Sequence, residues 1–514
     1  MGRVLAWVTA VLASLITACT SLPSREGRVE TTALTDTAGT RLGRAVASDV
    51  AANPGKTGVH ALLVPRDAFA ARVLLAAAAD RSLDAQYYIW HGDQTGTLLL
   101  EALWRSAKRG VRVRLLLDDN GTTGLDQTIA ALDAHPNLEV RLYNPFVHRD
   151  ARGLDLLTDF SRLNRRMHNK SFTADNQVSI VGGRNVGNEY FGAGNEVLFG
   201  DLDVLAVGSA VQEVSQEFDL YWNSASAYPA ASFVGTGGLG AVDRLEAGFA
   251  AARADPESIV YLEALHKAPF IRELLDGRPE LEWATARVVH DDPAKTLHVT
   301  ADAGVLLLAD LLRTMGRPQG ELDLVSPYFV TGRQGTTALA ALARRGVTVR
   351  ILTNSLAASD VAAVHAGYAK HREELLRAGV QLHEFKPSAS RDAQQEQWKL
   401  GGSSSAALHA KTFAVDRSRI FVGSFNFDPR SALLNTEMGI VIDSPMLAKR
   451  LAAFFDTVVP LAAYEVRLTP DGQSLEWIEQ SPSGDKRYDI EPGTSWLLRT
   501  GIGILSILPI DWLL

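Results

Sequence analysis

The chain has 514 residues, 46% of them hydrophobic and 21% charged, and at roughly 150 residues per domain this length predicts about three domains or one large duplicated unit. These proportions exclude wholesale disorder and a polytopic membrane protein. The 51 basic and 59 acidic residues give a net charge of −8, which disfavours nucleic acid as a partner. A single cysteine excludes an internal disulfide and a cysteine-based zinc site.

Residues 1–18 have the pattern of a bacterial lipoprotein signal. Arg3 supplies a positive start, Val4–Ile16 is a largely apolar run, and small residues precede Cys19. This spacing resembles a lipobox, in which cleavage occurs before the cysteine and the cysteine is then acylated. An uncleaved signal anchor is the alternative, but the apolar run is short for a bilayer core of about 30 Å. We therefore predict a lipid anchor on Cys19, at the extracytoplasmic face of the inner or outer membrane, followed by a linker over residues 19–60.

A strand, helix, strand unit occurs twice along the chain. Residues 83–90 and 111–117 predict two strands with a helix between them, and the same order returns with residues 322–330 and 347–352. Such units favour a parallel or mixed sheet with helices on both faces. The sequence therefore predicts an α/β fold made of two similar halves, which we draw over residues 61–223 and 303–460.

The remaining segments lie between and after these halves. Residues 224–302 predict a connector with a Gly-rich stretch and a charged helical segment, possible material for a lid. Residues 461–514 predict a C-terminal extension that contains the uncharged stretch Thr500–Ile510. As a helix this stretch covers about 16 Å, which is half a bilayer core, so it cannot span a membrane. An interfacial segment flanked by tryptophans and a helix docked on the core are the two alternatives.

A histidine near the middle of each half is followed two residues later by a lysine and seven residues later by an aspartate. Chance predicts about 0.14 copies of such a pattern in this composition. An asparagine and a glutamate follow each histidine at the same two distances, which strengthens the repeat. The candidate site residues are His168, Lys170, Asp175, Asn185 and Glu196 in the first copy, and His409, Lys411, Asp416, Asn426 and Glu437 in the second copy.

These residues resemble the signature of the phospholipase D superfamily, which is HxKxxxxD followed by a G-G/S-x-N turn. The turns here are Gly182–Asn185 and Gly423–Asn426. The resemblance covers roughly residues 60 to 514 and implies two phospholipase D-like halves with one active site at their interface. Further segments that look like the bacterial cardiolipin synthase branch, especially its short C type, are residues 86–90, residues 159–166, and Gly367, Tyr368 and Arg372.

The residue types fit the chemistry of a phosphodiester. Residues i and i+2 of a strand share a face, so the histidine and lysine of each copy project together. A displacement at phosphorus needs a nucleophile, a proton for the leaving alkoxide and positive charge for the other oxygens. Two histidines, two lysines and two asparagines supply all three. We expect no metal or other cofactor, because the lysines replace the cation and the carboxylates are not grouped.

The roles within the pair come from the resemblance and not from the spacing. It implies His168 as the nucleophile that forms a phosphohistidine, and His409 as the acid for the leaving oxygen and then the base for the acceptor. Glu196 and Glu437 fit the carboxylates that hold the other nitrogen of each imidazole and favour its protonated form. Each aspartate lies where a strand runs into a short turn, so backbone capping competes with catalysis as its role.

The resemblance implies a phosphatidyltransferase that makes cardiolipin at a membrane surface. Phosphatidylglycerol is the first expected substrate, and phosphatidylethanolamine is a second possible one. A hydrolytic phospholipase D, with water as acceptor and phosphatidic acid as product, uses the same catalytic atoms and stays as the alternative. A phosphodiesterase acting on nucleic acid ranks third, because the net negative charge and the envelope signal disfavour it.

Overall fold

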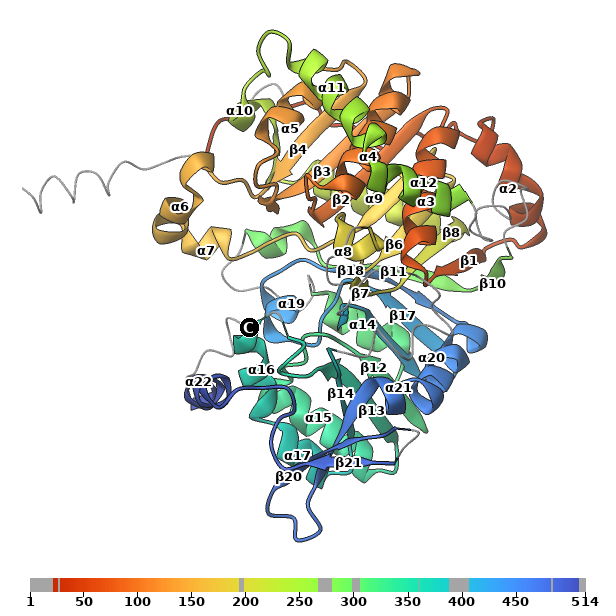
Figure 1. Ribbon diagram of the computed structural model, residues 1–514. Helices are drawn as coiled ribbons and strands as arrows, with labels where there is room; N and C mark the ends of the chain where they lie inside the picture. The colour runs from red at the N-terminus through yellow and green to blue at the C-terminus, as the bar shows by residue number, and fades with distance from the viewer. Residues whose placement is uncertain are drawn as a thin grey trace, which may run out of the picture.

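The computed structural model describes residues 22–25, 28–193, 198–266, 280–297, 306–359, 361–387, 406–481 and 484–507. These residues form two α/β halves that lie one above the other, each with helices around a central sheet (Figure 1). The predicted fold class of two similar halves is confirmed.

In the first half, one mixed sheet contains nine strands within the described ranges. β2, β3 and β4 are parallel to one another, and every other neighbouring pair is antiparallel. The strands in sheet order are β10 (Glu282–Ala284), β1 (Thr57–Leu62), β8 (Asp203–Gly208), β6 (Val178–Gly182), β5 (Ser171–Ala174), β2 (Ser82–Ile89), β3 (Arg112–Gly121), β4 (Leu138–Tyr143) and β9 (Ala227–Pro229).

The sheet of the second half repeats this order and these directions. β12, β13 and β14 form its parallel part, as β2, β3 and β4 do in the first half. The strands in sheet order are β11 (Ala286–His290), β18 (Met438–Ile442), β17 (Arg419–Gly423), β16 (Lys411–Val415), β12 (Glu321–Val325), β13 (Thr348–Asn354), β14 (Gln381–Phe385), β19 (Ala463–Leu468), β20 (Leu475–Glu479) and β21 (Lys486–Tyr488). From β1 to β9 in sheet order, eight strands of the first sheet thus have counterparts in the eight strands from β11 to β19 of the second.

The helices begin and end at local sequence signals. The Asp93 side chain accepts a hydrogen bond from the Gly96 amide and caps α4, while Gly110, at a φ of 95°, follows its last turn. The first-half helices are α2 (Arg41–Ala52), α3 (Pro65–Ala78), α4 (Gln94–Lys108), α5 (Asp126–Asp133), α6 (Arg152–Thr158), α7 (Phe160–Leu163), α8 (Asn188–Phe191), α9 (Ser209–Trp222), α10 (Ala231–Val234), α11 (Ala241–Ala254) and α12 (Pro256–His266). The second-half helices are α14 (Leu307–Met315), α15 (Gly332–Arg344), α16 (Ala362–Ala369), α17 (Arg372–Arg377), α19 (Pro429–Leu433), α20 (Pro445–Thr457), α21 (Val459–Ala462) and α22 (Trp496–Ile507).

Both halves extend beyond the boundaries drawn from the sequence. The predicted linker over residues 19–60 contains α2 and the start of β1, and the predicted C-terminal extension contains β19 to β21. The predicted connector over residues 224–302 supplies β9 and β10 to the first sheet and β11 to the second. Its helices α11 and α12 place Leu245, Phe249 and Tyr261 in the core of the first half, so both helices pack on that body. These strands have three to six residues, too few for a clear periodic signal.

The two halves share an apolar core where their sheets meet. Val181 of β6 and Val204 of β8 pack in one cluster with Ile420 of β17 and Ile440 of β18, and all four side chains are buried. Burial of apolar area stabilises such a contact by roughly 25 cal/mol per Å². Since these strands neighbour the two histidine-containing segments, the shared core fixes the position of one motif relative to the other. In the described part of the chain, no helix is both long and apolar enough to cross a bilayer.

Candidate active site

Backbone pairing across the interface brings the two histidines to one place. The His168 amide donates to the Thr436 carbonyl (2.8 Å), and the Thr436 amide donates to the Arg166 carbonyl (2.9 Å). In the matching position of the other motif, β15 (Ala406–Leu408) pairs in parallel with β7 (Leu198–Gly200). The His409 amide then donates to the Gly200 carbonyl (2.9 Å). Each motif is therefore attached to the half opposite its own.

A carboxylate from the opposite half contacts each imidazole. Glu437 Oε2 lies 2.8 Å from His168 Nδ1, as the sequence predicts for this glutamate and one imidazole. Asp201 Oδ2 lies 2.5 Å from His409 Nδ1. Both carboxyl groups are fully buried. A carboxylate that accepts the Nδ1–H leaves Nε2 directed at the substrate and fixes the tautomer.

The carboxyl group at the His409 ring belongs to Asp201, which was not selected from the sequence, whereas the one at His168 belongs to the expected Glu437. Glu196, the other glutamate expected at an imidazole, lies outside the described residues. The sheet register explains the difference: the Gly183 amide donates to the Leu202 carbonyl, and the Ser424 amide donates to the Met438 carbonyl. The residue before Leu202 is Asp201, and the residue before Met438 is Glu437.

The electrostatic environment keeps both imidazoles neutral. Burial, followed by the charges of Lys170 and Lys411, lowers the pKa of His168 well below its usual value. Burial and Lys411 lower the pKa of His409 to about 4, more than Asp201 raises it. Asp201 acts in the expected direction on His409, but burial and Lys411 outweigh it. A bound phosphodiester adds negative charge, which raises the pKa of both imidazoles.

The two carboxyl groups differ in charge at neutral pH. Burial raises the pKa of Glu437 to about 7, against the opposing charge of Lys170 and a 2.5 Å hydrogen bond from Ser424 Oγ. Burial acts on Asp201 in the same direction, yet its neighbours His409 and Lys411 lower its pKa to about 2. Asp201 is thus ionised throughout the physiological range, whereas Glu437 titrates within it.

The lysines lie beside their own histidines, as the two-residue spacing predicts. Lys170 Nζ and Lys411 Nζ each donate to the backbone carbonyl of the histidine in the same motif at 2.5 Å. Lys411 Nζ also lies 3.0 Å from His409 Nδ1. Burial lowers the pKa of Lys170 well below its usual value. β5 and β16 begin at Ser171 and Lys411, so each histidine precedes its strand and does not lie within it.

The asparagines differ in their contacts. Asn185 Oδ1 accepts from the Ile89 amide (3.2 Å), and its Nδ2 donates to the Tyr190 hydroxyl (3.0 Å). The Tyr190 ring in turn meets the His409 ring edge-on at a centroid distance of 5.2 Å. Among the described residues, buried Asn426 Oδ1 has no hydrogen-bond partner. Asn185 therefore supports the wall around His409, while Asn426 keeps a free acceptor.

Both motif aspartates cap backbone. The Asp175 carboxylate accepts from the amides of Asp80, Arg81 and Ser82 at 2.7–2.9 Å. Asp416 accepts from Gly320 at 2.7 Å and from Glu321 at 2.9 Å. These amides immediately precede or begin β2 and β12, and both aspartates have a φ of 52°. The backbone-capping alternative thus describes their contacts, and it ties each motif strand to its antiparallel neighbour, β5 to β2 and β16 to β12.

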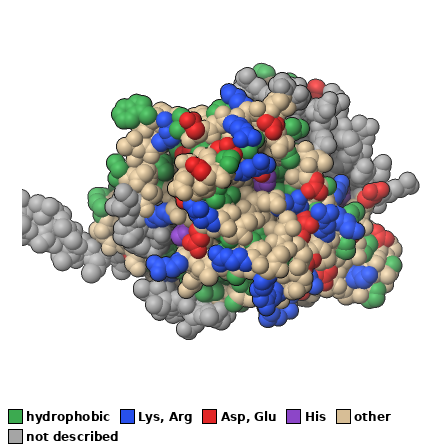
Figure 2. Space-filling view, turned by 90° about the horizontal axis from the view of Figure 1, so that it is seen from below, with side chains coloured by type: hydrophobic (Ala, Val, Ile, Leu, Met, Phe, Trp, Pro, Cys, Tyr) green, Lys and Arg blue, Asp and Glu red, His purple; other side chains and the backbone are tan. Residues whose placement is uncertain are grey.

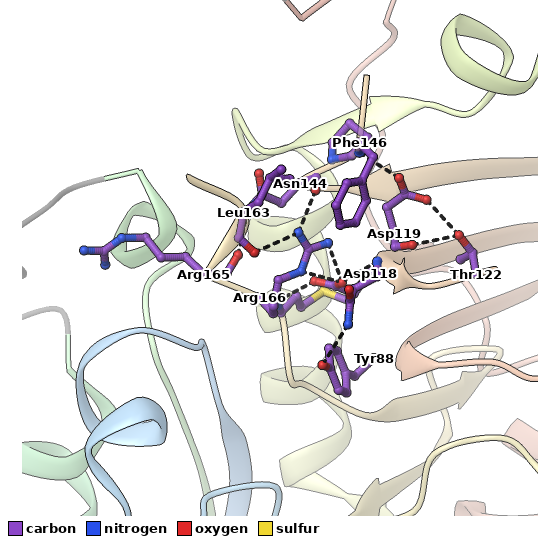
Figure 3. A network of polar contacts seen from close by, with 12 residues as sticks. Tyr88, Asp118, Asp119, Thr122, Asn144, Phe146, Leu163, Arg165 and Arg166 are labelled. Carbon is purple, nitrogen blue, oxygen red and sulfur yellow. Dashed lines mark hydrogen bonds and ion pairs between the residues drawn. The ribbon is translucent and has the colours of Figure 1, made fainter. Parts of the chain in front are cut away.

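Asp118, which was not selected from the sequence, holds the segment before His168 together with Arg166 (Figure 3). Arg166 donates from Nε and Nη2 to Asp118 Oδ1 (2.8 and 2.6 Å), and the Met167 amide donates to Asp118 Oδ2 (2.8 Å). Asp118 lies near the end of β3, where parallel strands present their carboxyl ends. Two sequence signals pointed to this contact. Asp118 follows a predicted parallel strand, and Arg166 belongs to the segment that resembles the cardiolipin synthase branch.

A second buried carboxyl group supports the turn between His168 and Lys170. Glu217 of α9 accepts from Asn169 Nδ2 (2.6 Å) and from Gln86 Nε2 (2.5 Å). Burial raises the pKa of Glu217 to about 7. No sequence pattern singled out this glutamate, because its partners come from distant elements. Across the described ranges, no group of three or more His, Cys, Asp or Glu side chains is arranged to hold a metal ion.

Two segments of the chain match one known protein family. The family described as "Cardiolipin synthase, PLD-like domain" matches residues 73–222 and 311–459, one segment for each half. The chain belongs to this family. The two matched segments contain every candidate residue of the two motifs, and the cardiolipin synthase-like chain is accordingly an enzyme of the phospholipase D type, with phosphatidyl transfer as its class of reaction.

Individual relatives agree with the family match. The chain is 48% identical over 474 residues to "Cardiolipin synthase C" of Escherichia coli, covering 92% of this chain and 100% of the relative. It is 25% identical over 395 residues to "Major cardiolipin synthase ClsA" of Bacillus subtilis, covering 76% of this chain and 66% of the relative. In fold, it resembles the crystal structure of a phosphatidylserine synthase from Haemophilus influenzae, with a TM-score of 0.57, 13% identity, and coverage of 91% of this chain and 99% of that one.

Proposed function

We propose that this cardiolipin synthase-like enzyme transfers a phosphatidyl group to the glycerol hydroxyl of phosphatidylglycerol, with cardiolipin as product. The reciprocal pair of imidazoles at one interface carries the proposal: His168 with Glu437, and His409 with Asp201. Phosphatidylglycerol or phosphatidylethanolamine serves as the phosphatidyl donor. The similarity to the Escherichia coli relative over its full length supports this choice of reaction.

The first half-reaction forms a phosphohistidine. His168 Nε2 attacks phosphorus, and the bond from phosphorus to the donor's head-group oxygen breaks. His409 takes up a proton as the anionic phosphodiester binds and raises its pKa, and it then gives that proton from Nε2 to the head-group oxygen, so glycerol or ethanolamine leaves as a neutral alcohol function. Lys170 and Lys411 supply positive charge for the other phosphoryl oxygens.

The second half-reaction returns the histidines to their starting state. His409 Nε2 takes the proton from the acceptor hydroxyl, the hydroxyl oxygen bonds to phosphorus, and the bond to His168 breaks. The ionised Asp201 stabilises the imidazolium that His409 passes through in each proton transfer. Its low pKa therefore supports His409 as the acid and base, and His168 as the nucleophile.

Apolar walls near His409 favour transfer over hydrolysis. The Phe199 ring stacks on the His409 ring at a centroid distance of 5.2 Å and an interplanar angle of 15°. A cavity of about 390 Å³ has Asp201 among its lining residues and is lined mainly by apolar groups, among them Leu202 and Leu408. Water competes with the lipid hydroxyl for the phosphohistidine only through its concentration. A lipid hydroxyl that the site holds in position gains an effective molarity that can reach about 10⁵ M.

Product analysis tests the reaction. Purified full chain in phosphatidylglycerol vesicles, with chelator and without added metal, should yield cardiolipin and free glycerol, and His168→Ala should yield neither. Added labelled phosphatidylethanolamine identifies the donor, because its use releases ethanolamine. Phosphatidic acid as the dominant product at every acceptor concentration would establish the hydrolase, and DNA cleavage without lipid turnover would reject both lipid reactions.

The proposal includes a lipid anchor on Cys19 and a place at the extracytoplasmic face of the envelope. Cys19 lies outside the described residues, so the support is the signal pattern itself. Acyl chains contribute about 0.8 kcal/mol per buried CH₂, so more than one chain gives firm anchoring. Cys19→Ser should block acylation and signal processing. Equal masses and equal membrane partition of the variant and the wild type would contradict the anchor.

A further inference from the structure

The helix α6 has its polar side turned toward the protein and its apolar side turned toward solvent. Arg152 donates to the Asp119 backbone carbonyl at 2.8 Å, and Asp155 is buried while it accepts from the His148 amide at 2.8 Å. Leu154 and Leu157 of the same helix are 58% and 83% exposed. A surface helix of a soluble protein has the reverse arrangement, so this apolar side requires a different explanation.

A second element exposes large apolar side chains on the same side of the molecule. α22 buries Ile502 against Leu356 and Ala366, which confirms that it docks on the second half. Its other side leaves Trp496 and Leu497 66% and 64% exposed. The docked-helix alternative thus holds for one side of α22, and the interfacial alternative stays a prediction for its exposed side. Figure 1 shows α6, α7 and α22 along the left side, and Figure 2 shows hydrophobic side chains projecting at the left rim.

Contacts connect these two elements across the boundary between the halves. Arg430 of α19 donates to Asn164, which ends α7, at 2.7 Å from Nη2 to Oδ1. In the loop before α19, the Phe427 carbonyl accepts a hydrogen bond from the Val330 amide (2.8 Å). Val330 packs with Val364 of α16, and α16 in turn contacts α22. The exposed apolar residues of α6, α7 and α22 thus lie on elements that these contacts link along one side of the molecule, which we call the α6–α22 face. Its members are Leu154, Leu157, Phe160, Trp496, Leu497 and Ile504.

The described chain also begins on this side. Arg25 lies over the Tyr228 ring at 5.8 Å, and Figure 1 shows the described chain beginning at the left, the side on which α6 is drawn. Cys19 precedes Leu22 by three residues, which at about 3.5 Å per residue places the two Cα atoms within roughly 11 Å of each other. A lipid attached to Cys19 therefore holds a bilayer close to the α6–α22 face.

We infer that the α6–α22 face is the surface by which the enzyme rests on the lipid bilayer. The inference rests on the proposed function in taking the substrate to be a membrane phospholipid. Leucine, phenylalanine and tryptophan side chains enter the boundary between headgroups and acyl chains, while α22, about 18 Å long, is too short to span. α7 ends at Leu163, five residues before His168, so the bound bilayer lies beside the segment that leads into the site.

Fluorescence quenching locates the bilayer directly. Full chain is bound to phosphatidylglycerol vesicles whose acyl chains carry bromine, a contact quencher of tryptophan. Quenching should be strong for the wild type and should fall in Trp496→Phe, because Trp496 enters the acyl region. Equal quenching of the two proteins would overturn the inference, and this result does not depend on which lipid the enzyme converts.

Turnover provides a second measurement with a matched control. Leu157→Glu and Leu497→Glu should each lower turnover on vesicles about tenfold, the loss expected for one leucine kept out of the apolar region. Turnover of a dispersed short-chain phospholipid should stay unchanged. Val260→Glu, on the exposed side of α12 at the right of Figure 1, should leave both activities unchanged. Equal vesicle turnover in all three variants, or an equal loss in Val260→Glu, would contradict the assigned face.

Discussion

The two histidine sites have the same motif and the same cross-half contact, yet they differ in the carboxyl group that holds the imidazole. Asp201 lies 2.5 Å from His409 Nδ1 and has a pKa of about 2, whereas Glu437 lies 2.8 Å from His168 Nδ1 and has a pKa of about 7. An ionised partner stabilises an imidazolium, and a partly protonated one does so less. Two copies of one motif can therefore have unequal roles, because the residues around each copy differ.

The largest effect should come from the imidazoles themselves. His168→Ala and His409→Ala should each lower kcat by roughly 10⁵-fold, and the double variant should lose little more, because both groups act on one phosphate. Initial rates of cardiolipin formation measure this. Mass analysis of His409→Ala should detect phosphatidyl on His168. Substantial activity in either single variant would contradict the model in which both histidines act at one shared site.

Asp201→Asn should have the next largest effect. The amide keeps the shape of the side chain but removes the charge that stabilises the His409 imidazolium and fixes its tautomer, so kcat should fall roughly 10³-fold. Thermal unfolding checks that the fold is retained. A decrease equal to that of Glu437→Gln would show that the two carboxyl groups have equal roles, contrary to the difference in pKa.

Glu437→Gln should lower kcat/KM by about tenfold to a hundredfold and remove a titration near neutral pH. In the wild type, kcat/KM should rise with pH through about 7 as Glu437 ionises and accepts the Nδ1–H of His168. The free energy of unfolding depends on pH in the opposite direction. Folding raises the pKa of Glu437 from 4.5, so its contribution to stability is fully present below pH 4.5 and is lost as the pH rises through about 7. A wild-type profile that is flat between pH 6 and 8 would contradict this assignment.

The smallest effect on catalysis should come from the capping aspartates. Asp175→Ala leaves three backbone amides without their acceptor and should lower the free energy of unfolding by about 3 kcal/mol, with less loss for the more exposed Asp416→Ala. The kcat of the folded fraction should stay within about threefold of the wild type, in line with the modest cost of a residue outside the reacting groups. Denaturant unfolding and rates measured below the melting temperature separate the two quantities. A large loss of kcat at full stability would make the aspartates part of the chemistry.

The sequence predicted the repeated α/β halves and the meeting of the two motifs because both depend on local patterns. It did not identify Asp201, because equal counting from each histidine assumes that the two copies have no insertions. The pairing of Gly183 with Leu202 and of Ser424 with Met438 shows that the sheet register is preserved while the loop length is not. Asp118 and Glu217 were missed for a related reason, since their partners come from elements far along the chain. The inverted orientation of α6 was equally inaccessible, because its pattern does not reveal which side faces the protein.

The exchange of carboxylates between the halves has a consequence for the origin of the molecule. In a twofold homodimer, a contact from residue i of one subunit to residue j of its partner occurs twice by symmetry. A single half with a histidine and a following acid would therefore generate both pairs on dimerisation, and duplication with fusion would preserve them in one chain. Fusion also frees each copy to diverge, and the aspartate in one pair with the glutamate in the other is the kind of divergence that a homodimer cannot encode.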